Sequence, residues 1–412
     1  MIKFDRFQLS NGLKVIVHKD KTTPILAFNL LYNVGAKDEN PNKTGFAHLF
    51  EHLMFGGSAN IPSYDEPLQK VGGSNNAFTS NDITNYYITL PKENIETAFW
   101  LESDRMLKLA FTQKSLDVQR NVVIEEFKQR YLNQPYGDIM LLLRPIAYKK
   151  HPYKWATIGK EISHIENANM NDVKSFFYSH YAPNNAILSI AGDIETSVVK
   201  KLAEKWFLPI EKRDVEIRNL EQEPKQTEAR SLSVKKDVPF DVIVKTYHMC
   251  SRTDKDYYAT DLLSDILSNG KSSRFNQILV KQKRLFSSVD AHIMGSIDNG
   301  LFLIEGTLMK GIKMKDAEKA INEELNKLLK EKIDEYELNK VKNKVISRLI
   351  FSQVSPLNKA MSLSFYELIG NAENINNEAG NYQKVTINQI QKVANNVLSP
   401  TNCSSIYYYS GN

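Results

Sequence analysis

Residues 44–55 read Thr-Gly-Phe-Ala-His-Leu-Phe-Glu-His-Leu-Met-Phe, an apolar stretch that carries two histidines and a glutamate. His48 and His52 are four residues apart, so on an α-helix their side chains lie on one face, one above the other. Three ionisable groups in a buried apolar helix require a partner, and a metal ion is the simplest one. We therefore expect a helix here whose two histidines bind one metal ion. The competing interpretation is a helix with one histidine in a polar network and the other in solvent.

A catalytic zinc ion needs a third protein ligand and leaves its fourth position to water. Residues 120–130 have a helical pattern in which Glu126 lies on the apolar stripe and Glu125 points away. The stripe is expected to consist of Val122, Val123 and Phe127. A carboxylate on a buried face requires a counter-charge, whereas one on the outer face does not. Glu126 is therefore the expected third ligand, and Glu102 is the weaker rival.

Glu51 directly precedes His52 and is offset from it by about 100° around a helix. As a metal ligand Glu51 would distort the geometry of the site, but as a general base beside the attacking water it fits. The sequence therefore predicts zinc-assisted hydrolysis, with one zinc ion per chain and Glu51 as the catalytic residue.

The composition is that of an ordinary globular protein. With 412 residues the chain exceeds the size of a single core, so two domains are expected. A net charge of +5 over this length favours neither a nucleic-acid partner nor a polybasic membrane surface. Cys250 and Cys403 form no disulfide framework, and we interpret them as thiols in a reducing compartment. Neither a signal segment nor a membrane span is evident, which predicts a cytoplasmic protein, or a periplasmic one if a signal was removed.

The order of the predicted elements repeats along the chain. Strands and hairpins are expected at 4–18, 25–32, 75–90, 186–191 and 242–249, and helices at 93–107, 115–132 and 259–268. When the halves are aligned, Asp261-Leu-Leu-Ser-Asp265 lies opposite His48–His52, with matching apolar positions and no metal ligands. We therefore predict an α+β fold with two homologous domains, each a mainly antiparallel sheet packed with helices, related as a degenerate internal repeat. Residues 1–212 would be the zinc-bearing catalytic domain, 213–230 the linker, and 231–412 a homologous non-catalytic domain.

The motif His-x-x-Glu-His is typical of the inverzincins, and the sequence around it resembles the pitrilysin family, in its short two-domain branch with the mitochondrial processing peptidases and bacterial homologues. The matching segments are Asn11–Val15, Val34–Glu39, Thr44–Phe55, Asn76–Thr79, His151–Tyr153, Ile158–Gly159 and Tyr181–Asn185. The resemblance runs essentially end to end and implies a zinc endopeptidase that acts on peptides or unfolded segments. It also implies that Glu126 is the third ligand. Where the family has a further glutamate seven residues earlier, this chain has Gln119, for which a role beside the metal ligands is plausible.

The resemblance further implies that substrate is added as an extra strand to an exposed sheet edge near the zinc ion. The matching positions are Asn76, Ala77 and Phe78. Without the resemblance, the favoured interpretation of this segment is an ordinary edge strand with Phe78 in the core.

The second half of the chain departs from the family pattern. Family members that complete the site within one chain or one homodimer carry Leu-Arg-x-x-x-x-Leu-x-Tyr, and here Val280 replaces the arginine and Ser287 the tyrosine. The resemblance then implies a heterodimer whose homologous partner supplies the Arg/Tyr pair, with a homodimer as the alternative. A core-type subunit that binds peptides or has only a structural role is a different class of function. Such subunits usually lack one or more zinc ligands, whereas this chain keeps all of them.

Overall fold

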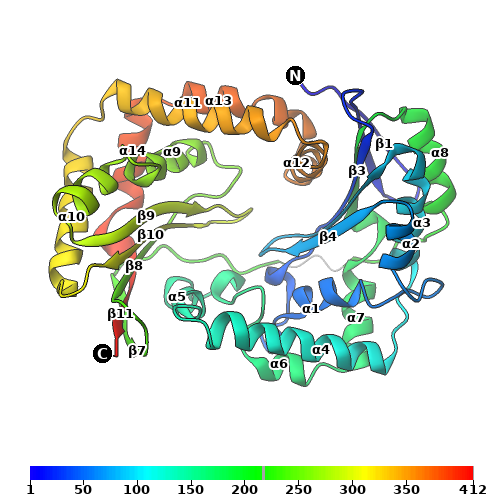
Figure 1. Cartoon of the computed structure of the whole chain (residues 1–412), viewed down its shortest axis with the longest axis horizontal. Coiled ribbons are helices and arrows are strands. Elements are labelled where there is room, and N and C mark those ends of the chain that lie inside the picture. The colour runs from blue at the N-terminus through cyan, green and yellow to red at the C-terminus, as the bar shows by residue number, and fades with distance from the viewer. Residues whose placement is uncertain (216–218, 412) are drawn as a thin grey trace. The chain divides into compact units, whose positions relative to one another are not determined.

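The computed structural model describes residues 1–215 and 219–411, which form two compact units, each built from three separate segments of the chain (Figure 1). The first unit consists of Met1–Gln129, Trp155–Leu220 and Ile350–Asn377. The second consists of Arg130–Lys154, Glu221–Leu349 and Glu378–Asn412. Of the expected linker 213–230, residues 216–218 lie outside the described residues.

The first unit contains a six-stranded sheet. In spatial order its strands are β1 (Asp5–Gln8), β2 (Lys14–Lys19), β6 (Ala186–Gly192), β3 (Ile25–Tyr32), β5 (Thr84–Pro91) and β4 (Ser74–Thr79). All neighbours are antiparallel except β2 and β6. The predicted hairpin at Asn11-Gly12 joins β1 to β2, and Gly12 takes the positive φ of 95° that this turn requires. Strand β4 is left at one edge of the sheet.

Side chains of β3 alternate between two helical layers. Asn29 donates a hydrogen bond to Ser364 of α12 (Pro356–Leu368), which covers one face. Phe28 points to the other face and packs edge-on against Phe99 of α3 (Ile95–Leu107). The remaining helices of this unit are α1 (Phe46–Leu53), α2 (Asp65–Lys70), α4 (Gln113–Phe127), α6 (Ile162–Glu166), α7 (Met170–His180) and α8 (Thr196–Trp206). Helix α1 packs on α4 and against β4, so the edge strand and the histidine helix are neighbours.

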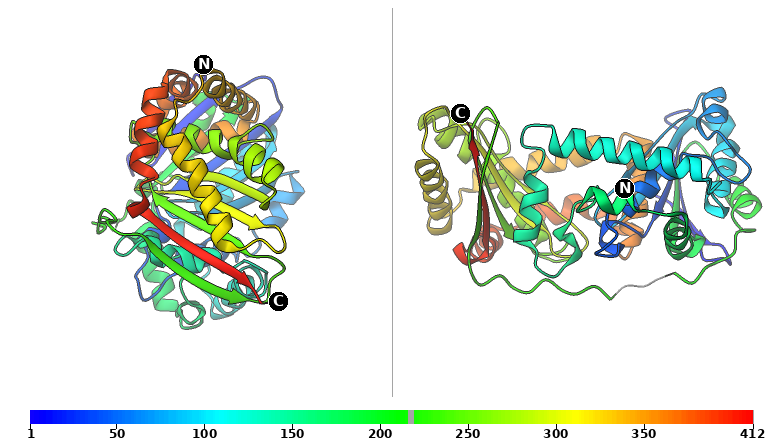
Figure 2. Two further views of the ribbon diagram at one scale, coloured as in Figure 1. Left: turned by 90° about the vertical axis from the view of Figure 1, so that its left-hand side faces the viewer. Right: turned by 90° about the horizontal axis from the view of Figure 1, so that it is seen from below.

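The second unit contains a five-stranded sheet. Its spatial order is β7 (Arg230–Lys236), β11 (Cys403–Ser410), β8 (Val242–His248), β10 (Leu301–Leu308) and β9 (Phe286–Met294). One face packs against α9 (Tyr257–Ser268), α10 (Met314–Lys330) and α14 (Ile387–Val397), which the left view of Figure 2 shows in front of the strands. Part of the other face packs against α5 (Ile139–Ala147). Two further helices of the second half are the long α11 (Glu335–Ser352) and the short α13 (Glu378–Lys384).

The two sheets share one topology, which confirms the predicted α+β fold with an internal repeat. In each sheet a parallel pair (β2–β6, β7–β11) is followed by three antiparallel partners in the same order. Helix α9 lies between β8 and β9 in the chain, as α1 lies between β3 and β4. Asp261 and Asp265 therefore occupy the helix that corresponds to α1, and they bring no imidazole to it.

The described residues contain no helix that combines the length and apolarity needed to cross a membrane. Cys250 and Cys403 are both free thiols, as the sequence predicts.

Candidate metal centre

Helix α1 is a buried element that begins at a glycine. Gly45 has a φ of 86°, and a Cβ there would lie 2.6 Å from the Ile158 carbonyl oxygen, so only glycine fits at this position. The apolar side chains of the helix are buried: Phe46, Ala47, Leu49, Phe50 and Leu53. His48 and His52 remain 14% and 24% exposed on the remaining face, so this face is accessible to a small ligand.

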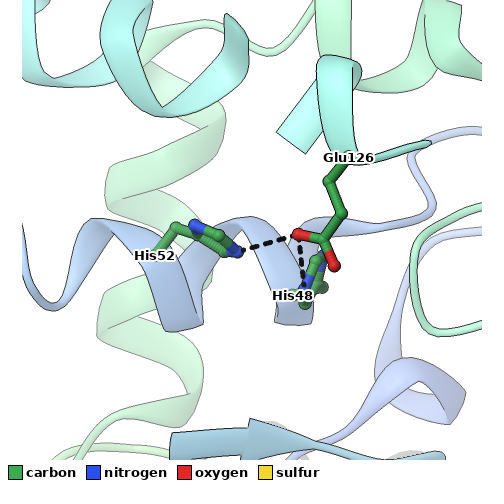
Figure 3. Close-up of side chains that lie close together, drawn as sticks. All are labelled: His48, His52 and Glu126. Carbon is green, nitrogen blue, oxygen red and sulfur yellow. Dashed lines mark ion pairs between the residues drawn. The ribbon is translucent and has the colours of Figure 1, made fainter. Parts of the chain in front are cut away.

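Glu126 brings its carboxylate to both histidines from α4 (Figure 3). Its Oε2 lies 3.7 Å from His48 Nε2 and 3.4 Å from His52 Nε2. Bonds of 2.0–2.1 Å in a tetrahedral zinc site separate the ligand atoms by about 3.3–3.4 Å. The distance to His52 matches this spacing, the distance to His48 is slightly longer, and all three ligand atoms lie within 4.8 Å of one another, so small side-chain shifts would bring the three residues to the geometry of a zinc site. Within residues 1–215 and 219–411, no other group of three histidine, cysteine or acidic side chains has comparable spacing.

Exposure separates the two adjacent glutamates of α4. The Glu126 side chain is 18% exposed, whereas that of Glu125 is 60% exposed and pairs with Lys128. The predicted apolar stripe is wrong at one position, because Val122 is 44% exposed. The buried stripe follows the helical spacing of Leu116, Val123, Ile124 and Phe127, and Val122 lies about 100° away from Val123 around the helix.

The rival carboxylate, Glu102, is used elsewhere. It is fully buried on α3 and accepts two hydrogen bonds from Arg105, of 2.8 and 2.5 Å. The Tyr64 hydroxyl donates a third, and the guanidinium lies 4.3 Å from the ring centre of Tyr86. The counter-charge that a buried carboxylate requires is here an arginine, and Glu102 is not part of the metal-binding group.

Glu51 lies on α1 within reach of the same site. The Thr79 hydroxyl of β4 donates a 2.6 Å hydrogen bond to Glu51 Oε2. Burial raises the pKa of Glu51, while the bond from Thr79 and the neighbouring His52 act in the opposite direction. A carboxyl group with a raised pKa beside a metal site suits proton transfer near neutral pH. The sequence patterns did not identify Thr79 as a partner of Glu51, although Thr79 ends the segment Asn76–Thr79 that resembles the pitrilysin family.

The three predicted substrate-binding residues lie on the edge strand β4. Since Thr79 faces α1, alternation places Ala77 on the α1 face and Asn76 and Phe78 on the opposite face. The Ala77 N–H donates to the Asn76 side-chain oxygen over 2.8 Å, so it is directed away from β5. Phe78 is only half-buried, which argues against a core role. The free edge of β4 therefore borders the helix that carries the histidines.

Three further residues are singled out by the sequence: Gln119, Val280 and Ser287. Gln119 is half-buried on α4, two turns before Glu126. In the second unit, Val280 packs against the hydrophobic core from the helical turn Asn276–Gln282. Ser287 is exposed on β9 and donates to the Thr307 carbonyl. The roles assigned to these residues stay predictions.

Known families and proteins match both parts of the chain. Residues 14–160 match the family model described as "Insulinase (Peptidase family M16)", and residues 167–345 match "Peptidase M16 inactive domain". The zinc protease PqqE of Helicobacter pylori is 30% identical over 411 residues, covering 98% of this chain and 92% of that protein. The uncharacterized zinc protease YmxG of Bacillus subtilis is 25% identical, covering 100% and 99%.

Solved structures have the same fold. A crystal structure of a protease from Helicobacter pylori has a TM-score of 0.94 and 30% sequence identity, over 99% of this chain and 100% of that one. A peptidase M16 inactive domain from Pseudomonas fluorescens has a TM-score of 0.90 at 17% identity, over 100% and 99%, which shows a common fold.

Proposed function

The chain belongs to peptidase family M16, and from this premise we propose that it is a zinc-dependent endopeptidase that hydrolyses peptides or unfolded segments. The membership confirms the resemblance inferred from the sequence motifs. The observation that carries the proposal is the convergence of His48, His52 and Glu126 at the spacing of a zinc site. Relatives named as zinc proteases support it.

In this mechanism Glu51 is the general base. A zinc ion held by His48, His52 and Glu126 would supply Lewis acidity, which polarises the scissile carbonyl and acidifies a water molecule. Glu51 takes the proton from the attacking water and passes it to the leaving amine. The bond from Thr79 occupies one carboxyl oxygen of Glu51 and orients the other for this transfer.

Substrate would be held by the free edge of β4. A peptide in extended conformation can pair with the outward main-chain groups near Ala77, after the Asn76 side chain releases the Ala77 N–H. Pairing of this kind uses main-chain groups, so sequence preference should be loose. Because such pairing requires an extended chain, the proposed substrates are peptides and unfolded segments rather than folded proteins.

The proposed active form is a heterodimer. The resemblance to the family implies that Val280 and Ser287 replace an arginine and a tyrosine that would stabilise the oxyanion, so a homologous subunit would supply that pair. The purified chain alone should then bind zinc but cleave slowly, and addition of the homologous subunit should raise kcat. Full activity from a proven monomer or homodimer would contradict this part of the proposal.

The variant Glu51→Gln tests the mechanism. It should retain one zinc ion per chain and lower kcat for a fluorogenic peptide by roughly 10²–10⁴-fold, the usual contribution of a general base. The matched control Glu125→Gln removes an exposed carboxylate and should leave the rate unchanged. Cleavage by Glu51→Gln at the wild-type rate would refute the mechanism. A wild-type chain that binds zinc and peptide but never cleaves, alone or with the homologous subunit, would instead be a peptide-binding subunit.

A further inference from the structure

The amino terminus of the histidine helix lacks a capping side chain of its own. The first helical N–H groups have no partner within a helix, and a serine, threonine, aspartate or asparagine usually accepts from one of them. In α1 the capping position is Gly45, which has no side chain. Close approach to Ile158 prevents any larger residue there.

Glu39 accepts these hydrogen bonds from outside the helix. Its Oε2 accepts from the Gly45 N–H over 2.9 Å and its Oε1 from the Ala47 N–H over 2.8 Å. The carboxyl group is 1% exposed and lies at the positive end of the helix dipole. The bond to Ala47 fixes the residue directly before His48.

Thr44, the residue before Gly45, makes further contacts at the start of α1. The Thr44 hydroxyl contacts His164 Nδ1 at 2.9 Å and accepts from the Lys160 N–H over 2.8 Å. Thr44 is fully buried, so the chain enters α1 through a fixed segment. The only side chain among these that bonds to the N–H groups at the start of the helix itself is Glu39.

We propose that Glu39 is a positioning residue of the metal centre: its buried carboxyl replaces the missing cap of α1 and sets the placement of His48 against Glu126. This inference rests on the proposed zinc site. Loss of either hydrogen bond would let the first turn fray, and His48 lies in that turn. Residues that hold metal ligands in place change metal affinity by about 10–100-fold when they are altered.

The test compares the zinc dissociation constants of two full-length variants by competition with a chromophoric chelator. Glu39→Gln keeps one acceptor but turns an amide N–H₂ toward a backbone N–H. Above pH 8, where the Glu39 carboxyl is ionised and both oxygens accept, zinc affinity should therefore fall by about 10–100-fold. The control Asp38→Asn alters the neighbouring carboxylate, which accepts from the Gly35 N–H. Its zinc affinity should stay within about threefold of wild type.

Thermal unfolding of the metal-free proteins separates positioning from general stability. A merely structural role would lower the melting temperature of Glu39→Gln and leave its zinc affinity unchanged, which would overturn the proposal. An equal loss of affinity in both variants would overturn it as well. If Glu39→Gln does not fold, Glu39→Asp serves as the test, because its carboxylate is one methylene shorter. Its zinc affinity should be lower than that of the wild type, and wild-type affinity in that variant would overturn the proposal. A wild-type chain that binds no zinc would instead refute the proposed function.

Discussion

Replacing Glu126 with glutamine should separate a metal ligand from an ordinary buried carboxylate. Glu126→Gln keeps the size of the side chain and removes the charge from the oxygen that lies 3.4 and 3.7 Å from the two imidazole nitrogens. Structural zinc sites with four protein ligands bind with roughly 10–16 kcal/mol, or about 3 kcal/mol per ligand. At about 1.4 kcal/mol for each tenfold change, loss of one ligand should weaken zinc binding by roughly a hundredfold.

The assay is a zinc titration of the metal-free chain against a competing chelator at fixed pH. The matched control is Glu125→Gln, which alters the adjacent carboxylate, paired with Lys128 and exposed on α4. The control should bind zinc with wild-type affinity. Equal affinities for the wild type and for Glu126→Gln would refute the reasoning that assigns this oxygen to the metal.

Three further predictions concern stability and substrate binding. Burial raises the pKa of Glu39 from 4.5 to about 8. Between these pH values the folded chain keeps a proton on Glu39 that the unfolded chain releases, so the contribution of Glu39 to the free energy of unfolding decreases as the pH rises. This decrease in the free energy of unfolding is at most about 5 kcal/mol, and Glu39→Gln should abolish it in denaturant titrations from pH 4.5 to 8. A variant with the same pH dependence of stability as the wild type would contradict this prediction. Ala77→Pro removes an N–H that is directed away from β5, so the melting temperature should stay unchanged while KM rises about tenfold. The control Phe78→Pro should instead unfold the edge strand. Equal KM values for Ala77→Pro and the wild type would exclude addition of substrate as a strand at β4. Glu102→Gln leaves the buried Arg105 without its charged partner and should lower stability by about 3–5 kcal/mol with zinc affinity unchanged; weakened zinc binding would make Glu102 the ligand after all.

Local sequence patterns were sufficient for the elements that carry the site. The Asn11-Gly12 turn, the strand at 25–32 and the apolar helix around His48 are each determined by neighbouring residues, and the structure has them where they are predicted. The orientation of Glu126 followed from helical periodicity even though Val122 was misplaced on the buried stripe. Val122 was misplaced because a helix at the surface can expose some of its apolar residues, so the buried face is narrower than the set of apolar residues in its sequence.

Contacts between distant segments could not be predicted in this way. The bond from Thr79 to Glu51 joins residues 28 positions apart, and the capping of α1 by Glu39 spans a turn that no periodicity describes. The same limit applies to α12, whose Ser364 contacts β3 from the opposite end of the chain. The repeat of the two sheets was visible in the order of elements, whereas the pairing of β6 with β2 and of β11 with β7 joins strands from opposite ends of each half and could not be predicted from neighbouring residues.

The most direct test of the central claim is a crystal structure of the zinc-loaded chain with anomalous diffraction recorded at the zinc absorption edge. The account predicts one anomalous peak, bonded at about 2.0–2.2 Å to His48 Nε2, His52 Nε2 and a carboxylate oxygen of Glu126. A peak at another group of residues, or none in a zinc-loaded crystal, would contradict the assignment of this chain as a zinc peptidase.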